Sequence, residues 1–205
     1  HQPKDFYTAQ YNADICRVES PESVLRNSHF EVYGETHHDT NLGSYNMEQN
    51  IRPAMDHGDI KLYLQPKVDL KTGEVTQAEA LVRWIDPKKG LIPVSDFLPE
   101  LEKNGLIGDL DLFLFERVCK NIRRWLELYG KKIRISVNLS SDMFNYRYFL
   151  KEYAAVYEKY PCPKDCIEFE LLESIVLNQV DQVQNVVGQL KNFGFSCSLD
   201  DFGSG

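Results

Sequence analysis

The sequence has few basic residues, few cysteines and no long apolar run. No apolar stretch approaches the roughly 20 residues that a membrane-spanning helix needs, so no such span is predicted. Its 205 residues carry 23 Lys and Arg against 31 Asp and Glu, a net charge of −8. Because an acidic surface repels a nucleic-acid backbone, a general DNA or RNA binder is disfavoured unless a local basic groove exists.

The five cysteines are an odd number and show no disulfide framework, which predicts reduced thiols and a cytoplasmic setting. Cys162 and Cys166 lie close together, but no second Cys or His pair is nearby, so ordinary thiols are favoured over a zinc site. His37 and His38 would point to opposite faces of a strand, which favours a solvated linker over a metal site.

What is present is core material and a repeating pattern of elements. Hydrophobic residues make up 42% and charged residues 26%, as in soluble globular domains. The turn at 69–74 is too short for a parallel crossover and predicts an antiparallel pair, whereas the alternation that follows predicts an α/β fold with a largely parallel sheet. Ser95 is predicted as a helix N-cap. Strands are predicted at 29–33, 60–65, 75–84, 133–137, 166–171 and 195–199, and helices at 47–57, 95–104, 107–125, 141–160 and 180–194.

Polar side chains follow the strands at the points where the strands end. In α/β folds reacting groups gather at the carboxyl ends of the strands, because the loops there vary while the sheet holds them. Every predicted strand from residue 60 onward has oxygen-bearing side chains at or near its carboxyl end, and Arg83 adds a positive charge. These candidate site residues are Gln65, Glu79, Arg83, Asn138, Glu170, Glu173, Asp200 and Asp201.

Structural roles compete with this interpretation. Asp200 and Asp201 could cap a turn, and Asn138 could cap a helix. Glu79 is harder to explain structurally, because it lies in an apolar stretch where a buried unpaired carboxylate costs several kcal/mol. Carboxylate and amide ligands without His or Cys favour Mg²⁺ or Mn²⁺, and paired carboxylates can hold two ions for phosphodiester hydrolysis. With Arg83 suited to a phosphate, the residues predict a metal-dependent phosphoester hydrolase.

Five segments, in order, resemble the motifs of one known family. The segments are the QPK-type strand at 64–67, the EAL signature at 79–84, the NLS segment at 137–140, the ELTE-type segment at 170–173 and the DDFG loop at 200–205. The resemblance is to the EAL domain, the family of cyclic di-GMP-specific phosphodiesterases of bacterial signalling. It extends from about Met47 to Gly205 and implies an α/β fold, a partial (β/α)8 TIM-like barrel whose first strand is antiparallel.

The resemblance also implies roles for the site residues. Glu79, Asn138, Glu170 and Asp200 would hold one Mg²⁺ or Mn²⁺, and Asp201 would hold a second ion together with Asp200. Glu79, Asp200 and Asp201 would then be catalytic in hydrolysis of cyclic di-GMP to linear pGpG by a metal-activated water.

Three further residues have implied roles outside the metal site. Gln65 and Arg83 would contact the dinucleotide, and Glu173 would anchor the loop after Asp201. Leu172 departs from the family pattern, which usually has Thr there, and this change is expected to affect loop ordering. A non-catalytic sensor that binds cyclic di-GMP is the alternative to a phosphodiesterase.

The expected domains are a remnant of a GGDEF domain at 1–33, a linker at 34–46 and an EAL domain at 47–205, truncated after its DDFGSG loop. From Ile60 to Gly205 there are 146 residues, against about 250 in a complete barrel, so about three strands and the family's general-base lysine are expected to be missing. The fragment alone is therefore expected to aggregate and to be inactive. The parent is expected to be cytoplasmic or membrane-tethered, with an adjacent GGDEF domain, and to dimerise through its EAL barrel.

Overall fold

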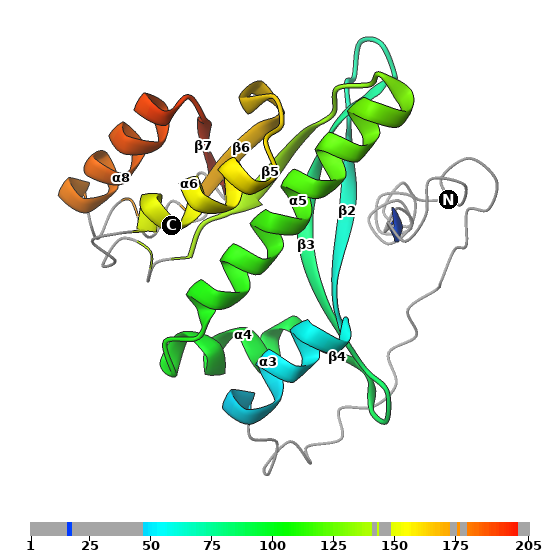
Figure 1. Ribbon diagram of the computed structural model, residues 1–205, viewed down its shortest axis with the longest axis vertical. Helices are drawn as coiled ribbons and strands as arrows, with labels where there is room; N and C mark the ends of the chain where they lie inside the picture. Colours follow the sequence, from blue (N-terminus) through cyan, green and yellow to red (C-terminus); the bar gives the residue numbers. More distant parts are fainter. Residues whose placement is uncertain are drawn as a thin grey trace, which may run out of the picture.

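The computed structural model describes residues 16–17, 47–140, 143, 149–172, 176 and 180–200. In these residues one mixed sheet runs in the order β1-β2-β3-β5-β6-β7, with β4 paired to β3 (Figure 1). The strands are β1 (Cys16–Arg17), β2 (Ile60–Val68), β3 (Val75–Asp86), β4 (Gly90–Ile92), β5 (Arg134–Asn138), β6 (Ile167–Leu172) and β7 (Ser196–Asp200). The helices are α3 (Met47–His57), α4 (Val94–Lys103), α5 (Ile107–Tyr129), α6 (Phe149–Lys159), the 3-10 turn η2 (Lys164–Cys166) and α8 (Val180–Phe193).

Strands β2 and β3 form the antiparallel pair that the short turn predicts. Asp69 organises the turn, since its Oδ1 accepts the backbone N–H groups of Lys71 at 2.8 Å and Thr72 at 3.0 Å. The Thr72 and Lys71 bonds lower the pKa of Asp69. Gly73 follows with a φ of 71°, a conformation that costs glycine nothing sterically. The antiparallel start of the sheet is therefore built by local turn chemistry.

From β3 onward the sheet is parallel, through β5 and β6 to β7. Helix α5 packs over β2, β3 and β5, and α6 lies beside α5 (Figure 1). This arrangement confirms the predicted α/β class. It also places the carboxyl ends of β5, β6 and β7 at one edge of the sheet, and it sets Glu79, which lies within β3, beside Ser136 near the end of β5.

The core lies between this sheet and its helices. Every second residue of β3 is buried, from Ala78 to Trp84, as the period of two in a strand requires. At the centre is Phe169, whose ring centroid lies 5.7 Å from that of Phe115, 5.5 Å from Tyr153 and 5.3 Å from Phe195. These four side chains, the aromatic cluster, join β6 to α5, α6 and the start of β7.

The helix start at Ser95 is a wrong prediction. Helix α4 begins at Val94 after Pro93, and no side chain caps it. The rigid φ of Pro93, −58°, is already suited to a helix start, and Ser95 instead donates from Oγ to Asp96 Oδ1 at 3.2 Å. The short strand β4 was not predicted. The strand predicted at 29–33 and most of 141–148 lie outside the described residues.

Tyr153 carries a polar atom that the core does not satisfy. Its side chain is fully buried, and its hydroxyl has no hydrogen-bond partner within the described residues. Burial raises the pKa of Tyr153 well above its usual value. Because a buried unpaired hydroxyl carries a desolvation cost, we expect Tyr153→Phe to leave the free energy of unfolding unchanged or to raise it by about 1 kcal/mol.

Tyr157→Phe is the matched control for this experiment. The Tyr157 hydroxyl donates to the Cys162 carbonyl at 2.5 Å, so the same change there should lower the free energy of unfolding by about 1 kcal/mol. Urea denaturation of both variants measures the difference. A loss at Tyr153→Phe equal to that at Tyr157→Phe would contradict the assignment of an unpaired hydroxyl.

Candidate metal centre

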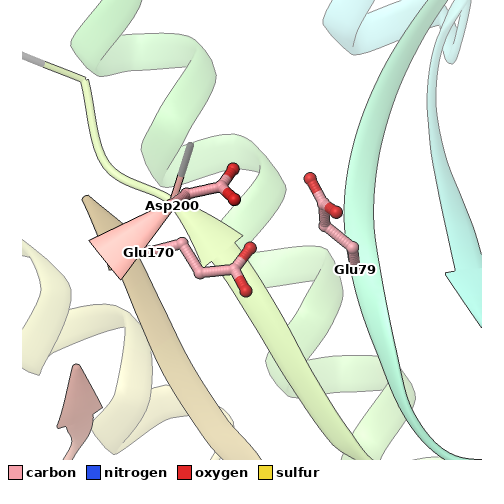
Figure 2. Close-up of side chains that lie close together, drawn as sticks. All are labelled: Glu79, Glu170 and Asp200. Carbon is pink, nitrogen blue, oxygen red and sulfur yellow. The ribbon is translucent and has the colours of Figure 1, made fainter. Parts of the chain in front are cut away.

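Five of the candidate residues come from neighbouring strands and lie on one face of the sheet. Gln65 on β2 is paired with Glu79 on β3, and Asn138 on β5 is paired with Glu170 on β6. Asp200, at the end of β7, is paired with Leu172. Figure 2 shows the carboxylates of Glu79, Glu170 and Asp200 turned toward one another from three strands.

These three carboxylates form what we call the acidic cluster. One oxygen from each of Glu79, Glu170 and Asp200 lies within 4.8 Å of the other two. The Asn138 amide donates from Nδ2 to Glu79 Oε1 at 3.1 Å, which leaves the Asn138 carbonyl oxygen as a further hard ligand. Three oxygen-bearing acids and an amide at this spacing suit a hard divalent cation.

The surroundings of Glu79 raise its pKa above the usual value for a glutamate. Burial is the main cause that raises this pKa above its usual value, and the negative charges of Glu170 and Asp200 raise it further. The Asn138 hydrogen bond and the charge of Lys67 lower it, but they do not cancel the rise. A bound cation would reverse the balance, because it favours the ionised carboxylate.

Glu170 is the most buried of the three acids, with 7% of its surface exposed. Lys67 donates from Nζ to Glu170 Oε1 at 2.6 Å and to Ser136 Oγ at 2.9 Å. The other oxygen, Glu170 Oε2, is buried and has no hydrogen-bond partner in the described part of the chain. A buried carboxylate oxygen without a donor is costly, and a cation in the acidic cluster would satisfy it.

Sequence reasoning missed Lys67 and Ser136 as parts of this site. The available signal was the period of two: Lys67 lies two residues after Gln65 on β2, and Ser136 lies two residues before Asn138 on β5. Both therefore share the face of the acidic cluster. The pattern does not show that a residue on β2 reaches β6.

The structure describes only part of the remaining set of predicted residues. The half-buried Arg83 donates from Nη1 to the Val82 carbonyl at 2.7 Å, so its predicted role with phosphate stays a prediction. Asp201 and Glu173 lie outside the described residues. Leu172 is 38% exposed, beside Asp200 in the strand pairing.

Among the described helices, none combines the length and apolar character that a bilayer span requires.

Comparison with known proteins identifies relatives of this chain. The model of the EAL domain family matches residues 48–205. The cyclic di-GMP phosphodiesterase NbdA of Pseudomonas aeruginosa is 33% identical over 160 residues, which are 78% of this chain and 20% of NbdA. The cyclic di-GMP phosphodiesterase PdeR of Escherichia coli K12 is 31% identical over 159 residues, 78% of this chain and 24% of PdeR.

The fold has solved relatives as well. The structure of the PaMucR phosphodiesterase in complex with c-di-GMP superposes with a TM-score of 0.71 at 30% sequence identity. The match covers 78% of this chain and 64% of that one. The chain thus spans a fifth to a quarter of the two curated relatives and about two thirds of the solved domain. A partial barrel of the predicted type agrees with this coverage.

Proposed function

The chain belongs to the EAL domain family, and from this premise we propose that its parent protein hydrolyses cyclic di-GMP to linear pGpG with Mg²⁺ or Mn²⁺. The observation that carries the proposal is the acidic cluster, in which three carboxylates converge and a buried Glu170 oxygen has no donor among the described residues. The names of NbdA and PdeR as cyclic di-GMP phosphodiesterases support the choice of substrate.

We propose that Glu79, Glu170, Asp200 and Asn138 hold a divalent cation, and that Asp201 joins Asp200 at a second one. A cation bound there would supply charge neutralisation and Lewis acidity toward a phosphodiester. The chain's own contribution is to hold the ligands: Asn138 fixes Glu79 by its hydrogen bond, and the parallel register sets Asn138 beside Glu170.

Substrate contacts are proposed for residues next to the acidic cluster. Gln65 is paired with Glu79 across the hairpin, so the Gln65 amide on this face would reach a substrate bound at the acidic cluster. Arg83 lies four residues beyond Glu79 on β3 and has a planar guanidinium suited to a phosphate. Glu173 is proposed to anchor the loop that follows Asp201.

The proposal also concerns the rest of the parent protein. We propose the domain division 1–33, 34–46 and 47–205, with a GGDEF domain beside the EAL domain and a homodimer formed through the barrel. The naming of MucR as a bifunctional diguanylate cyclase and cyclic di-GMP phosphodiesterase supports the pairing of two such domains.

Turnover of cyclic di-GMP by the full-length gene product tests the proposed function. Chromatography should show pGpG when Mg²⁺ or Mn²⁺ is present and none after chelation by EDTA. Tight binding of cyclic di-GMP without turnover would instead establish the sensor alternative. If the protein neither binds nor hydrolyses cyclic di-GMP, both functions are contradicted.

Cation affinity should depend on pH through Glu79. Because its pKa is raised, Glu79 stays protonated to a higher pH than an exposed glutamate, and the proton competes with the cation. Mn²⁺ affinity is therefore expected to rise as the pH increases through that pKa and to level off above it. In the cation-free protein the folded state favours protonated Glu79. The contribution of Glu79 to the free energy of unfolding is therefore lost as the pH rises through the same pKa.

Mn²⁺ titrations between about pH 4 and about pH 8 measure this dependence, since the range begins below the ordinary pKa of a glutamate and extends well above it. Glu168→Gln is a matched control: this residue lies on the same strand as Glu170 but outside the acidic cluster, and it should keep the wild-type profile. Equal Mn²⁺ affinity at both ends of the range would contradict the role of Glu79.

A further inference from the structure

Lys67 reaches across the sheet to a strand that is not its neighbour. It lies on β2, whereas its partners Ser136 and Glu170 lie on β5 and β6, with β3 in between. In a flat sheet β2 and β6 would be roughly 14 Å apart, three strand spacings. The bond of 2.6 Å between Lys67 Nζ and Glu170 Oε1 therefore requires the sheet to curl, so that Lys67 spans the inside of the curve.

The contact distinguishes the two oxygens of Glu170. Lys67 holds Oε1, while Oε2 is buried without a hydrogen-bond partner in the part of the chain that is described. Glu79 and Asp200 offer their oxygens to the same cluster. Ser136 in turn contacts Lys67 Nζ at 2.9 Å, so the ammonium is itself held from a second strand.

We propose that Lys67 is a positioning residue of the cation site: it holds Glu170 by Oε1 so that Oε2 serves the acidic cluster. This inference rests on the cation site of the proposed function. Ser136 contributes indirectly, because it fixes the Lys67 ammonium. Neither residue needs to touch the cation or the substrate to do this.

Two effects of Lys67 on cation affinity oppose each other. Its positive charge repels a dication, but the Lys67 side chain is 40% exposed, so water screens this repulsion. Glu170 has a side chain only 9% exposed, and without Lys67 its Oε1 would lose this donor, while Oε2 already has none among the described residues. Because an uncompensated buried charge is the larger cost, loss of Lys67 is expected to displace Glu170 and to weaken cation binding.

Mn²⁺ titration of the full-length gene product, followed by the electron paramagnetic resonance signal of free Mn²⁺, tests this inference without any assay of activity. Lys67→Met should raise the Kd for Mn²⁺ about 10- to 100-fold, the range for partners that orient metal ligands. Ser136→Ala keeps the charge and should raise the Kd less, in the same direction. The double variant should match Lys67→Met, because the two residues act as one unit.

Lys71→Met is the matched control, since Lys71 is exposed in the turn after β2 and away from the acidic cluster. It removes the same charge and should leave the Kd unchanged. Mn²⁺ binding by Lys67→Met as tight as wild type, or tighter, would overturn the positioning role while the proposed function stands. Failure of the wild type to bind Mn²⁺ would overturn both. If Lys67→Met does not fold, an unchanged Kd in Ser136→Ala overturns the inference.

Discussion

Glu79→Gln is expected to lower kcat for cyclic di-GMP hydrolysis by about a thousandfold, which corresponds to about 4 kcal/mol of lost stabilisation. The substitution keeps the size of the side chain and an oxygen for Asn138, but it removes one of the three charges of the acidic cluster. An amide is a weaker ligand for a hard cation than a carboxylate. Loss of the cation should therefore account for the effect, and Mn²⁺ affinity should fall in parallel.

The control for this prediction is again Glu168→Gln, which makes the same chemical change near Glu170. Glu168 lies near Arg134, with 3.9 Å between Oε2 and Nη1, and not in the acidic cluster. Its substitution should change kcat less than about threefold, because it leaves the three carboxylates of the acidic cluster in place. A Glu79→Gln enzyme with kcat within about tenfold of wild type would contradict the assignment of Glu79 as a metal ligand.

Phe169→Ala is expected to lower the free energy of unfolding by about 3 to 5 kcal/mol. Phe169 is fully buried at the centre of the aromatic cluster, where its ring meets those of Phe115, Tyr153 and Phe195. Truncation removes the burial of the ring and leaves a cavity that a sheet and two helices cannot readily close. Because Phe169 directly precedes Glu170 on β6, activity should fall with stability.

Leu70→Ala is the comparison for this change, because Leu70 is 99% exposed at the tip of the β2–β3 hairpin. Its free energy of unfolding should stay within about 0.5 kcal/mol of wild type. Chemical denaturation of the full-length gene product measures both variants. A Phe169→Ala loss below about 1 kcal/mol would show that the aromatic cluster is loosely packed and would contradict its place at the centre of the core.

Local patterns predicted the parts of the fold that local interactions determine. The turn with Asp69 was short enough to require an antiparallel hairpin, and the structure has that pairing from Ile60 to Val68. Alternating strands and helices predicted the parallel sheet that follows. Parallel strands end at one edge, but Glu79 is the fifth of the twelve residues of β3, so its place near Glu170 also depends on the register of β3 against β5.

What the sequence left open depends on three-dimensional curvature and on competing local contacts. The link from Lys67 to Glu170 joins residues 103 positions apart across two intervening strands, and only the curl of the sheet makes it short. Ser95 has the composition of an N-cap, but Pro93 starts the helix. Arg83 donates to the backbone carbonyl of Val82, and no sequence pattern shows whether its guanidinium binds a backbone carbonyl or a phosphate.

The most direct measurement of the central claim is an anomalous difference map from crystals of the full-length gene product grown with Mn²⁺. We expect a peak among the carboxylates of Glu79, Glu170 and Asp200, with the Glu170 oxygen that Lys67 does not hold turned toward it. A map with no peak there at saturating Mn²⁺, or with Mn²⁺ bound only elsewhere, would contradict the claim that the strand ends of this sheet form a cation site.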